Sequence, residues 1–251
     1  MALAQARCGG GVTPRMLHVA CAAVALALAV AGCQFPADVD GTLDRVRGGT
    51  LRVGVTHAPP FVVVRDDREP GGVEARLVER FAARLDADVE WVRGSEAELM
   101  GALHGRQLDI VIAGLTRHSP WQREVTLTRP YLTTQWVIAA PDERTADALS
   151  EDLEGQVVAV EAHSEIAAKL AEDTDAEVRP VDDIGAASGP KAVPDYLLDD
   201  LGLVRTDAEL DEHEHAMAVP MGENAFLVEL ERFLLDSEHE AGRLLEREAR
   251  P

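Results

Sequence analysis

Apolar residues recur along the chain with two alternating periods. Short apolar runs at Leu51–Val55, Val89–Val92 and Asp109–Ala113 are typical of β-strands. Between them, the apolar positions of Val73–Leu85 follow the helical period, and Glu96–His104 predicts a second, shorter helix. The order β-α-β-α-β predicts a parallel sheet with right-handed crossovers and with binding sites at the carboxyl ends of its strands.

A second α/β unit follows. Gln135–Ala140 predicts a further strand that ends at Pro141, after which the alternation restarts. It continues with helices at 146–153, 165–171 and 196–201 and with strands at 157–160, 178–181 and 216–219. A C-terminal amphipathic helix carries Phe226, Leu230, Phe233 and Leu234 on one face. We therefore expect one lobe from residues 50–141 and 218–251 and a second from 142–217, with crossings near Pro141 and Pro220.

The N-terminus predicts export. Arg7 and Arg15 precede the apolar run Val19–Ala31, whose 13 residues are fewer than a membrane span needs, about 20, and suit a signal peptide. Val30-Ala31-Gly32-Cys33 resembles a bacterial lipobox, so we expect residues 1–32 to be a lipoprotein signal peptide, Cys33 to be lipidated and residues 33–49 to form a tether. An ordinary secretory peptide cut nearby, or a start at Met16, is the alternative. Either places the protein in the periplasm or at the cell surface.

Charge narrows the range of partners. The chain has 24 basic and 45 acidic residues and a formal charge of −21, which disfavours nucleic acid. The excess is concentrated in residues 142–217, which hold 22 acidic and 5 basic side chains. This is either a solvated acidic surface or a field that steers cationic ligands. Of the three cysteines, two lie in the predicted signal peptide and the third is Cys33, so the mature chain has no disulfide and depends on a packed core.

Three motifs appear in a specific order. Leu51–Val55 is followed by Pro59-Pro60-Phe61, Asp109–Ala113 leads into Gly114-Leu115-Thr116, and Pro130-Tyr131 lies further on. In this order and spacing they resemble the bacterial extracellular solute-binding proteins of family 3, over Leu51 to about Leu234. The resemblance implies an α/β, two-lobed periplasmic-binding-protein-like fold of type II, in which each lobe is a sheet flanked by helices. It also implies a non-enzymatic, monomeric receptor without cofactor or metal that closes on a small polar solute, such as an amino acid or an amine, and delivers it to an ABC importer.

The first lobe offers three candidate ligand-binding residues. Phe61 follows a strand, so its ring can cover a ligand at the strand's carboxyl end. Gly114 allows the backbone to approach a ligand closely, and Thr116 offers a hydroxyl and a free amide. The alternative is that Phe61 belongs to the core and that Thr116 caps a helix.

The motif departs from the family at one position. In amino-acid binders of this family, an arginine five residues after the Thr116 position clamps the ligand carboxylate. Here that position is Trp121, and Arg117 or Arg123 could substitute only if the loop were reshaped.

In the second lobe, the resemblance places the ligand-binding turn at His163-Ser164-Glu165 and the aspartate that receives a ligand ammonium at Asp195. With Trp121 as an aromatic face, these carboxylates suggest a cationic or amine ligand held partly by cation–π attraction. The alternative is that Trp121 packs inside its lobe and that Glu165 is a solvated acid at a helix start.

Other functions stay open. His213 and His215 share one face of a strand and could bind a transition metal, although such a run is more often a solvated loop. His57, His118 and His163 are each expected to border the cleft. A few relatives of the family are dehydratases, and a buried carboxylate with a raised pKa in the cleft would favour an enzyme here. A sensory or interaction lipoprotein that no longer serves transport is the third alternative.

Overall fold

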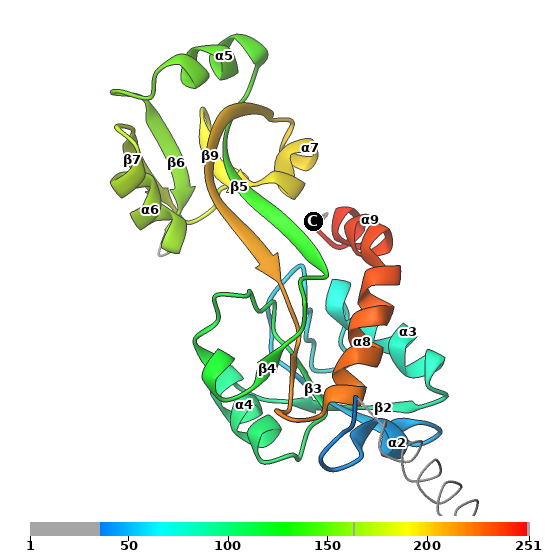
Figure 1. Cartoon of the computed structure of the whole chain (residues 1–251). Coiled ribbons are helices and arrows are strands. Elements are labelled where there is room, and N and C mark those ends of the chain that lie inside the picture. Colours follow the sequence, from blue (N-terminus) through cyan, green and yellow to red (C-terminus); the bar gives the residue numbers. More distant parts are fainter. Residues whose placement is uncertain (1–35, 163, 250–251) are drawn as a thin grey trace, which may run out of the picture. The chain divides into compact units, whose positions relative to one another are not determined.

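The computed structural model describes residues 36–162 and 164–249 (Figure 1). The predicted signal peptide, Cys33 and His163 lie outside the described residues. Residues Asp38–Pro251 form one compact unit. It contains two five-stranded sheets flanked by helices.

The first sheet has the order β2-β1-β3-β10-β4. Its strands are β1 (Thr50–Val55), β2 (Asp88–Arg93), β3 (Ile110–Ile112), β4 (Thr126–Leu127) and β10 (Ala218–Val219). β1 pairs in parallel with both β2 and β3, which confirms the predicted β-α-β-α-β arrangement. The connecting helices are α3 (Val73–Arg84) and α4 (Glu96–His104), and a 3-10 turn, η1 (Pro120–Arg123), precedes β4.

The second sheet has the order β7-β6-β8-β5-β9. Its strands are β5 (Leu132–Ala140), β6 (Val157–Glu161), β7 (Glu177–Val181), β8 (Lys191–Pro194) and β9 (Val204–His215), and its helices are α5 (Glu143–Glu151), α6 (Glu165–Asp173) and α7 (Leu198–Leu201), with the 3-10 turn η2 (Asp195–Leu197). β5 was expected in the first lobe, yet it pairs with β8 on one side and β9 on the other. Its apolar residues 137–140 are buried because the strand lies inside this sheet.

The chain therefore passes between the sheets at residues 128–131 and 216–217, not near Pro141 and Pro220. The two segments are bonded to each other: the Thr128 amide donates to the Met217 carbonyl at 2.9 Å, and the Tyr131 amide donates to the His215 carbonyl at 3.0 Å. Figure 1 shows β5 and β9 running together from these crossings into the second sheet. We call 128–131 and 216–217 the crossing segments.

Part of the expected tether is folded. α2 (Thr42–Val46) buries Leu43 and Val46 in the core of the first sheet. The carboxylate of Asp38 accepts hydrogen bonds from the Leu43 and Phe226 amides, at 2.8 and 2.9 Å, and so ties this segment to the C-terminal helix. Polar and glycine-rich composition suggested a flexible segment, but two apolar side chains are enough to anchor one helical turn.

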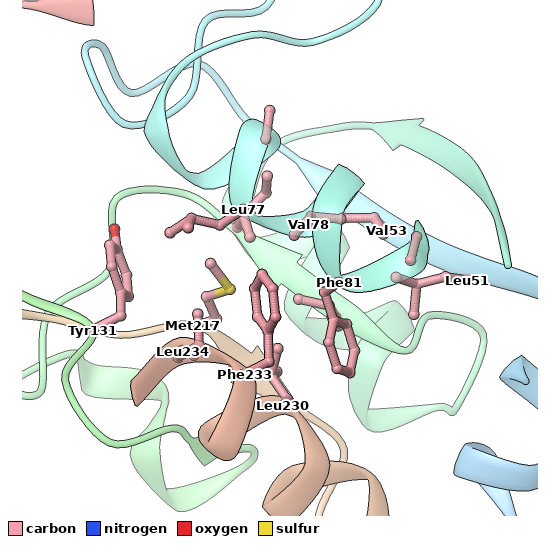
Figure 2. Packing of buried hydrophobic residues seen from close by; sticks show 14 of the residues in the cluster. Leu51, Val53, Leu77, Val78, Phe81, Tyr131, Met217, Leu230, Phe233 and Leu234 are labelled. Carbon is pink, nitrogen blue, oxygen red and sulfur yellow. The ribbon is translucent and has the colours of Figure 1, made fainter. Parts of the chain in front are cut away.

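The main core joins β1, α3 and the C-terminal helices α8 (Asn224–Asp236) and α9 (Glu238–Glu248). Figure 2 shows Phe81 of α3 beside Phe233 of α8, with ring centroids 5.4 Å apart. The four apolar residues expected on one face of the C-terminal helix are all buried, which confirms that face. Among the described residues, none of the helices is both long and apolar enough to span a membrane.

Candidate functional site

A cavity of about 600 Å³ is lined by residues of both sheets and their connecting loops. It lies where strands end: Pro59 and Pro60 follow β1, Glu161 is the last residue of β6, and Pro194 is the last of β8. The C-terminal end of α9 completes the wall. This agrees with the expectation that a ligand binds at the carboxyl ends of the strands. The full lining is Pro59, Pro60, Val63, Arg65, Trp136, Glu161, Ile184, Ala192, Val193, Pro194, Tyr196, Leu197, Glu248 and Ala249.

The cavity combines aromatic rings with an excess of carboxylates. Trp136 of β5 and Tyr196 of η2 supply the rings, and Glu161 and Glu248 supply carboxylates against one guanidinium, that of Arg65. Burial, together with the negative charges of Asp195 and Glu161, raises the pKa of Tyr196 to about 12. The carboxylates of Asp195 and Glu161 therefore both act on the part of the cavity wall that Tyr196 forms.

Phe61 lies at the edge of this site, in the core of the structure. Its ring is 8% exposed and stacks on the His215 ring, with centroids 4.0 Å apart and planes at 28°. It also meets Tyr196 edge-on at 6.3 Å. Phe61 thus joins the loop after β1 to β9 and to η2, while its neighbours Pro59 and Pro60 face the cavity.

Gly114 lies next to Phe61, and Thr116 lies next to His215. Gly114 has a φ of +64°, and a Cβ there would come within 3.2 Å of the Ala58 Cβ and 3.4 Å of a Phe61 ring carbon. Only glycine fits this close approach without strain. Thr116 forms an isolated bridge with His215 instead of capping a helix. The structure therefore brings the three first-lobe candidates together around His215.

His215 itself is buried, and beside its ring contacts its Nε2 is hydrogen-bonded to the Thr134 hydroxyl at 3.0 Å, while its Nδ1 has no hydrogen-bond partner among the described residues. Burial, followed by the charge of His213, lowers its pKa to about 4. The two rings lie 6.3 Å apart. Within residues 36–162 and 164–249, no three histidine, cysteine or acidic side chains gather as metal ligands would. His57 accepts a hydrogen bond from the Val64 amide at 3.1 Å, which gives it a local partner.

Trp121 is placed away from the cavity. The half-buried indole packs with the apolar cluster around α4, and its Nε1 donates to the Glu96 carboxylate at 2.5 Å. The nearby Arg117 guanidinium donates to the Thr128 carbonyl at 3.1 Å, toward a crossing segment. This geometry matches the alternative in which Trp121 packs within its lobe.

The second-lobe candidates flank the cavity wall. The Ser164 hydroxyl donates to the Glu161 carbonyl at 2.7 Å, which ties the start of α6 to the end of β6. Asp195 begins η2 and is half-buried beside Tyr196. Glu165 begins α6, and its side chain lies outside what the structure describes.

Sequence reasoning missed Arg65, Trp136, Glu161, Tyr196 and Glu248 of the cavity lining. Glu161 could have been found, since it directly follows the predicted strand 157–160 and the strand-end rule points to it. Tyr196 is adjacent to the expected Asp195. Trp136 and Glu248 carry no such signal, because their strand and helix reach the site only through tertiary packing.

The family comparison covers most of the chain. The model of the bacterial extracellular solute-binding proteins, family 3, matches residues 51–244. Among curated proteins, none matches the chain.

Similar solved structures cover most of the same region. An ancestral cationic amino acid solute-binding protein is 20% identical, with a TM-score of 0.65, and the match covers 82% of this chain and 98% of that one. A further structure of that ancestral protein, which is described as a precursor of cyclohexadienyl dehydratase, is 20% identical with a TM-score of 0.56. This match covers 82% of this chain and 98% of that one. The L-cystine solute receptor of Neisseria gonorrhoeae, in an unliganded open conformation, is 17% identical with a TM-score of 0.67, over 82% and 94% of the two chains. These likenesses establish the type II two-lobed fold.

Proposed function

The chain belongs to the bacterial extracellular solute-binding proteins of family 3, and from this premise we propose that it is a receptor for a small cationic solute, either an amino acid or an amine. The observation that carries the proposal is the charge of the cavity. Glu161, Asp195 and Glu248 act on it with three carboxylates, against the single guanidinium of Arg65. A cation placed there gains Coulomb attraction that a neutral or anionic solute does not.

The aromatic rings support the same class of solute. Trp136 and Tyr196 both line the cavity, and a cation over either ring face gains roughly 0.5–2 kcal/mol, the larger value when water is excluded. This role was first assigned to Trp121, whose indole lies elsewhere. We therefore transfer the cation–π contact to Trp136 and Tyr196 and keep Asp195 as the expected partner of a ligand ammonium.

The position of Arg65 favours a solute that also carries a carboxylate. Among the residues that the structure describes, Arg65 is the only basic one lining the cavity, and its guanidinium has no hydrogen-bond or ion-pair partner there. A free guanidinium can hold a carboxylate through two parallel hydrogen bonds. An amino acid with a cationic side chain satisfies both signs of charge, whereas an amine satisfies only the carboxylate wall.

The mechanism we propose is closure of the two lobes about the crossing segments. Residues up to 131 and from 216 onward would form one lobe, and residues 132–215 the other. Closure would exclude water from the polar contacts and strengthen them. We further propose that the protein is monomeric, held at the extracytoplasmic face of a membrane through lipidated Cys33, and that it delivers its solute to an ABC importer.

Two other functions remain as alternatives. A dehydratase-like enzyme is favoured by one observation, a buried Glu74 whose pKa burial raises to about 7, but Glu74 does not line the cavity. A sensory lipoprotein of the same fold would close on its solute equally well. Binding is common to the receptor and the sensor, so binding is tested first.

The test is calorimetry on the purified protein with arginine, lysine, agmatine, cadaverine, glutamine and glutamate. We expect the cationic solutes to bind and Glu161→Gln to weaken them about tenfold, since hydrogen bonds to charged groups contribute about 1.5–3 kcal/mol. Glu172→Gln, an exposed acid on α6, is the matched control and leaves affinity unchanged. Preference for glutamine or glutamate would refute the cationic class. X-ray scattering that stays unchanged at saturating solute would refute closure.

A further inference from the structure

Glu74 is a buried carboxylic acid that contacts three segments of the first lobe without lining the cavity. It is the second residue of α3 and is 0% exposed. Its own amide donates to the Phe61 carbonyl at 2.9 Å. Its Oε2 accepts from the Gly114 amide at 3.0 Å, and its Oε1 accepts from the Tyr131 hydroxyl at 2.8 Å.

These three contacts reach three separate segments of the first lobe. Phe61 belongs to the loop after β1, Gly114 to the turn after β3, and Tyr131 to a crossing segment. His215 also links two of these segments, because its backbone carbonyl accepts from the Tyr131 amide and its ring stacks on the Phe61 ring. A displacement of Tyr131 in the crossing segment would therefore change the position of the same carboxylate that accepts from the Gly114 amide.

We propose that Glu74 is a positioning residue that holds the Phe61 loop, the Gly114 turn and the Tyr131 crossing segment in the arrangement that binds solute. The inference rests on the proposed function, because it concerns affinity for a solute in the cavity. Glu74 itself touches no solute; it acts through the groups that it orients.

The charge state of Glu74 should matter for this role. Burial raises its pKa to about 7, opposed by the hydrogen bonds from the Gly114 amide, the Tyr131 hydroxyl and the Ala113 amide. Charge-assisted hydrogen bonds are roughly twice as strong as neutral ones, so protonation loosens both side-chain contacts. Solute affinity should therefore rise as pH increases through about 7.

The groups that face the carboxylate do not titrate in that range. Tyr131, from the crossing segment, has a pKa raised well above its ordinary value by burial and by the charge of Glu74. His215, from β9, lies 6.4 Å from the Tyr131 ring and has a pKa of about 4. β3 and the loop after β1 present backbone amides and Phe61. A transition near pH 7 that disappears with Glu74 is therefore assigned to Glu74.

Folding stability changes with pH in the opposite direction, and this separates positioning from a merely structural role. Because the pKa of Glu74 is raised on folding, the folded state binds the proton more tightly. The contribution of Glu74 to stability is then present below its unfolded pKa of about 4.3 and is lost as pH rises to about 7. A structural role changes stability with pH and leaves affinity flat.

The experiment measures lysine affinity by calorimetry at pH 6, 7 and 8.5 in wild type, Glu74→Gln, Tyr131→Phe and Glu79→Gln. The α-amino group of free lysine loses part of its proton toward pH 8.5, so each variant is compared with wild type at the same pH, where this loss is identical. Glu79 is a partly exposed acid on the same helix and serves as the control. We expect Glu79→Gln to behave as wild type, Glu74→Gln to bind about tenfold more weakly at pH 8.5 with a flat profile, and Tyr131→Phe to fall between them. Wild-type affinity and pH dependence in Glu74→Gln would overturn the inference.

A second arm needs no solute and keeps the inference testable if Glu74→Gln folds poorly or if no solute binds. The Gly114 amide nitrogen shift is followed against pH by NMR in wild type, Tyr131→Phe and Glu79→Gln. The inference requires a midpoint near pH 7 in wild type and faster hydrogen exchange at Gly114 in Tyr131→Phe than in Glu79→Gln. Equal exchange would overturn it. Loss of lysine binding in wild type with this pattern intact would refute the proposed function alone.

Discussion

Removing one oxygen from the crossing segments should destabilise the whole protein. Thr128 is fully buried, and its hydroxyl accepts from the Met217 amide at 3.1 Å and donates to the Arg129 carbonyl at 2.9 Å. Thr128→Val keeps the side-chain shape but leaves the buried Met217 amide without this acceptor. An unsatisfied buried donor costs about 1–3 kcal/mol. At about 2–4 °C per kcal/mol for a protein of this size, the melting temperature should fall by roughly 2–12 °C.

The assay is urea unfolding followed by circular dichroism, with the free energy extrapolated to water. Thr133→Val is the matched control, because Thr133 is exposed on β5 and valine suits a strand. We expect no loss for the control. A difference of less than about 0.5 kcal/mol between the two variants would refute the claim that the Thr128 hydroxyl supports the crossing, since exposed substitutions alone vary by that much.

Three further outcomes follow from the structure. Trp121→Phe removes the hydrogen bond to Glu96 and should cost about 1 kcal/mol in urea unfolding, while solute affinity stays unchanged; a large loss of affinity would place the indole in the binding site after all. Gly114→Ala forces a positive φ on alanine and should cost about 1–2 kcal/mol in thermal unfolding, and a neutral result would contradict the close approach. Hydrogen bonds from Arg52 and Arg45 outweigh the effect of burial and lower the pKa of Asp109. The stability that Asp109 contributes is therefore present above about pH 4 and is lost as pH falls through its folded pKa. Asp109→Asn should lack this loss when unfolding is followed at decreasing pH.

The parallel part of the first sheet was predictable because its strands and helices follow one another directly in the sequence. β1, α3, β2, α4 and β3 follow one another with clear periods, and a parallel strand pair leaves few choices of partner. β5 was expected in the first lobe because the apolar pattern of a strand does not show which strands it pairs with; it pairs with β8 and β9. β4 and β10 are two residues long, too short for a period to show, so the crossings could not be located from them.

The site was predictable where backbone geometry decides it. The close approach at Gly114 was predictable because a glycine directly after a buried strand indicates it, and the structure places Gly114 against Phe61; their role in binding stays a prediction. Trp121 was predicted to face the ligand, but the type of side chain at a motif position does not determine its direction; in the structure its Nε1 donates to the Glu96 carboxylate of α4. Trp136 comes from β5 and reaches the cavity only because β5 lies beside β8.

The acidic second half of the chain and the selectivity of the cavity are separate effects. Residues 142–217 hold 22 acidic side chains, of which Glu161 lines the cavity and Asp195 adjoins it. The other acids act at a distance, where salt shortens the range of their field from about 30 Å at 0.01 M to about 8 Å at 0.15 M. They can speed the arrival of a cation but cannot distinguish one cation from another. In the receptor that we propose, discrimination would rest on short-range contacts in the cavity, above all on Asp195, Trp136 and Tyr196, which are partly buried and therefore less screened by salt than the exposed acids.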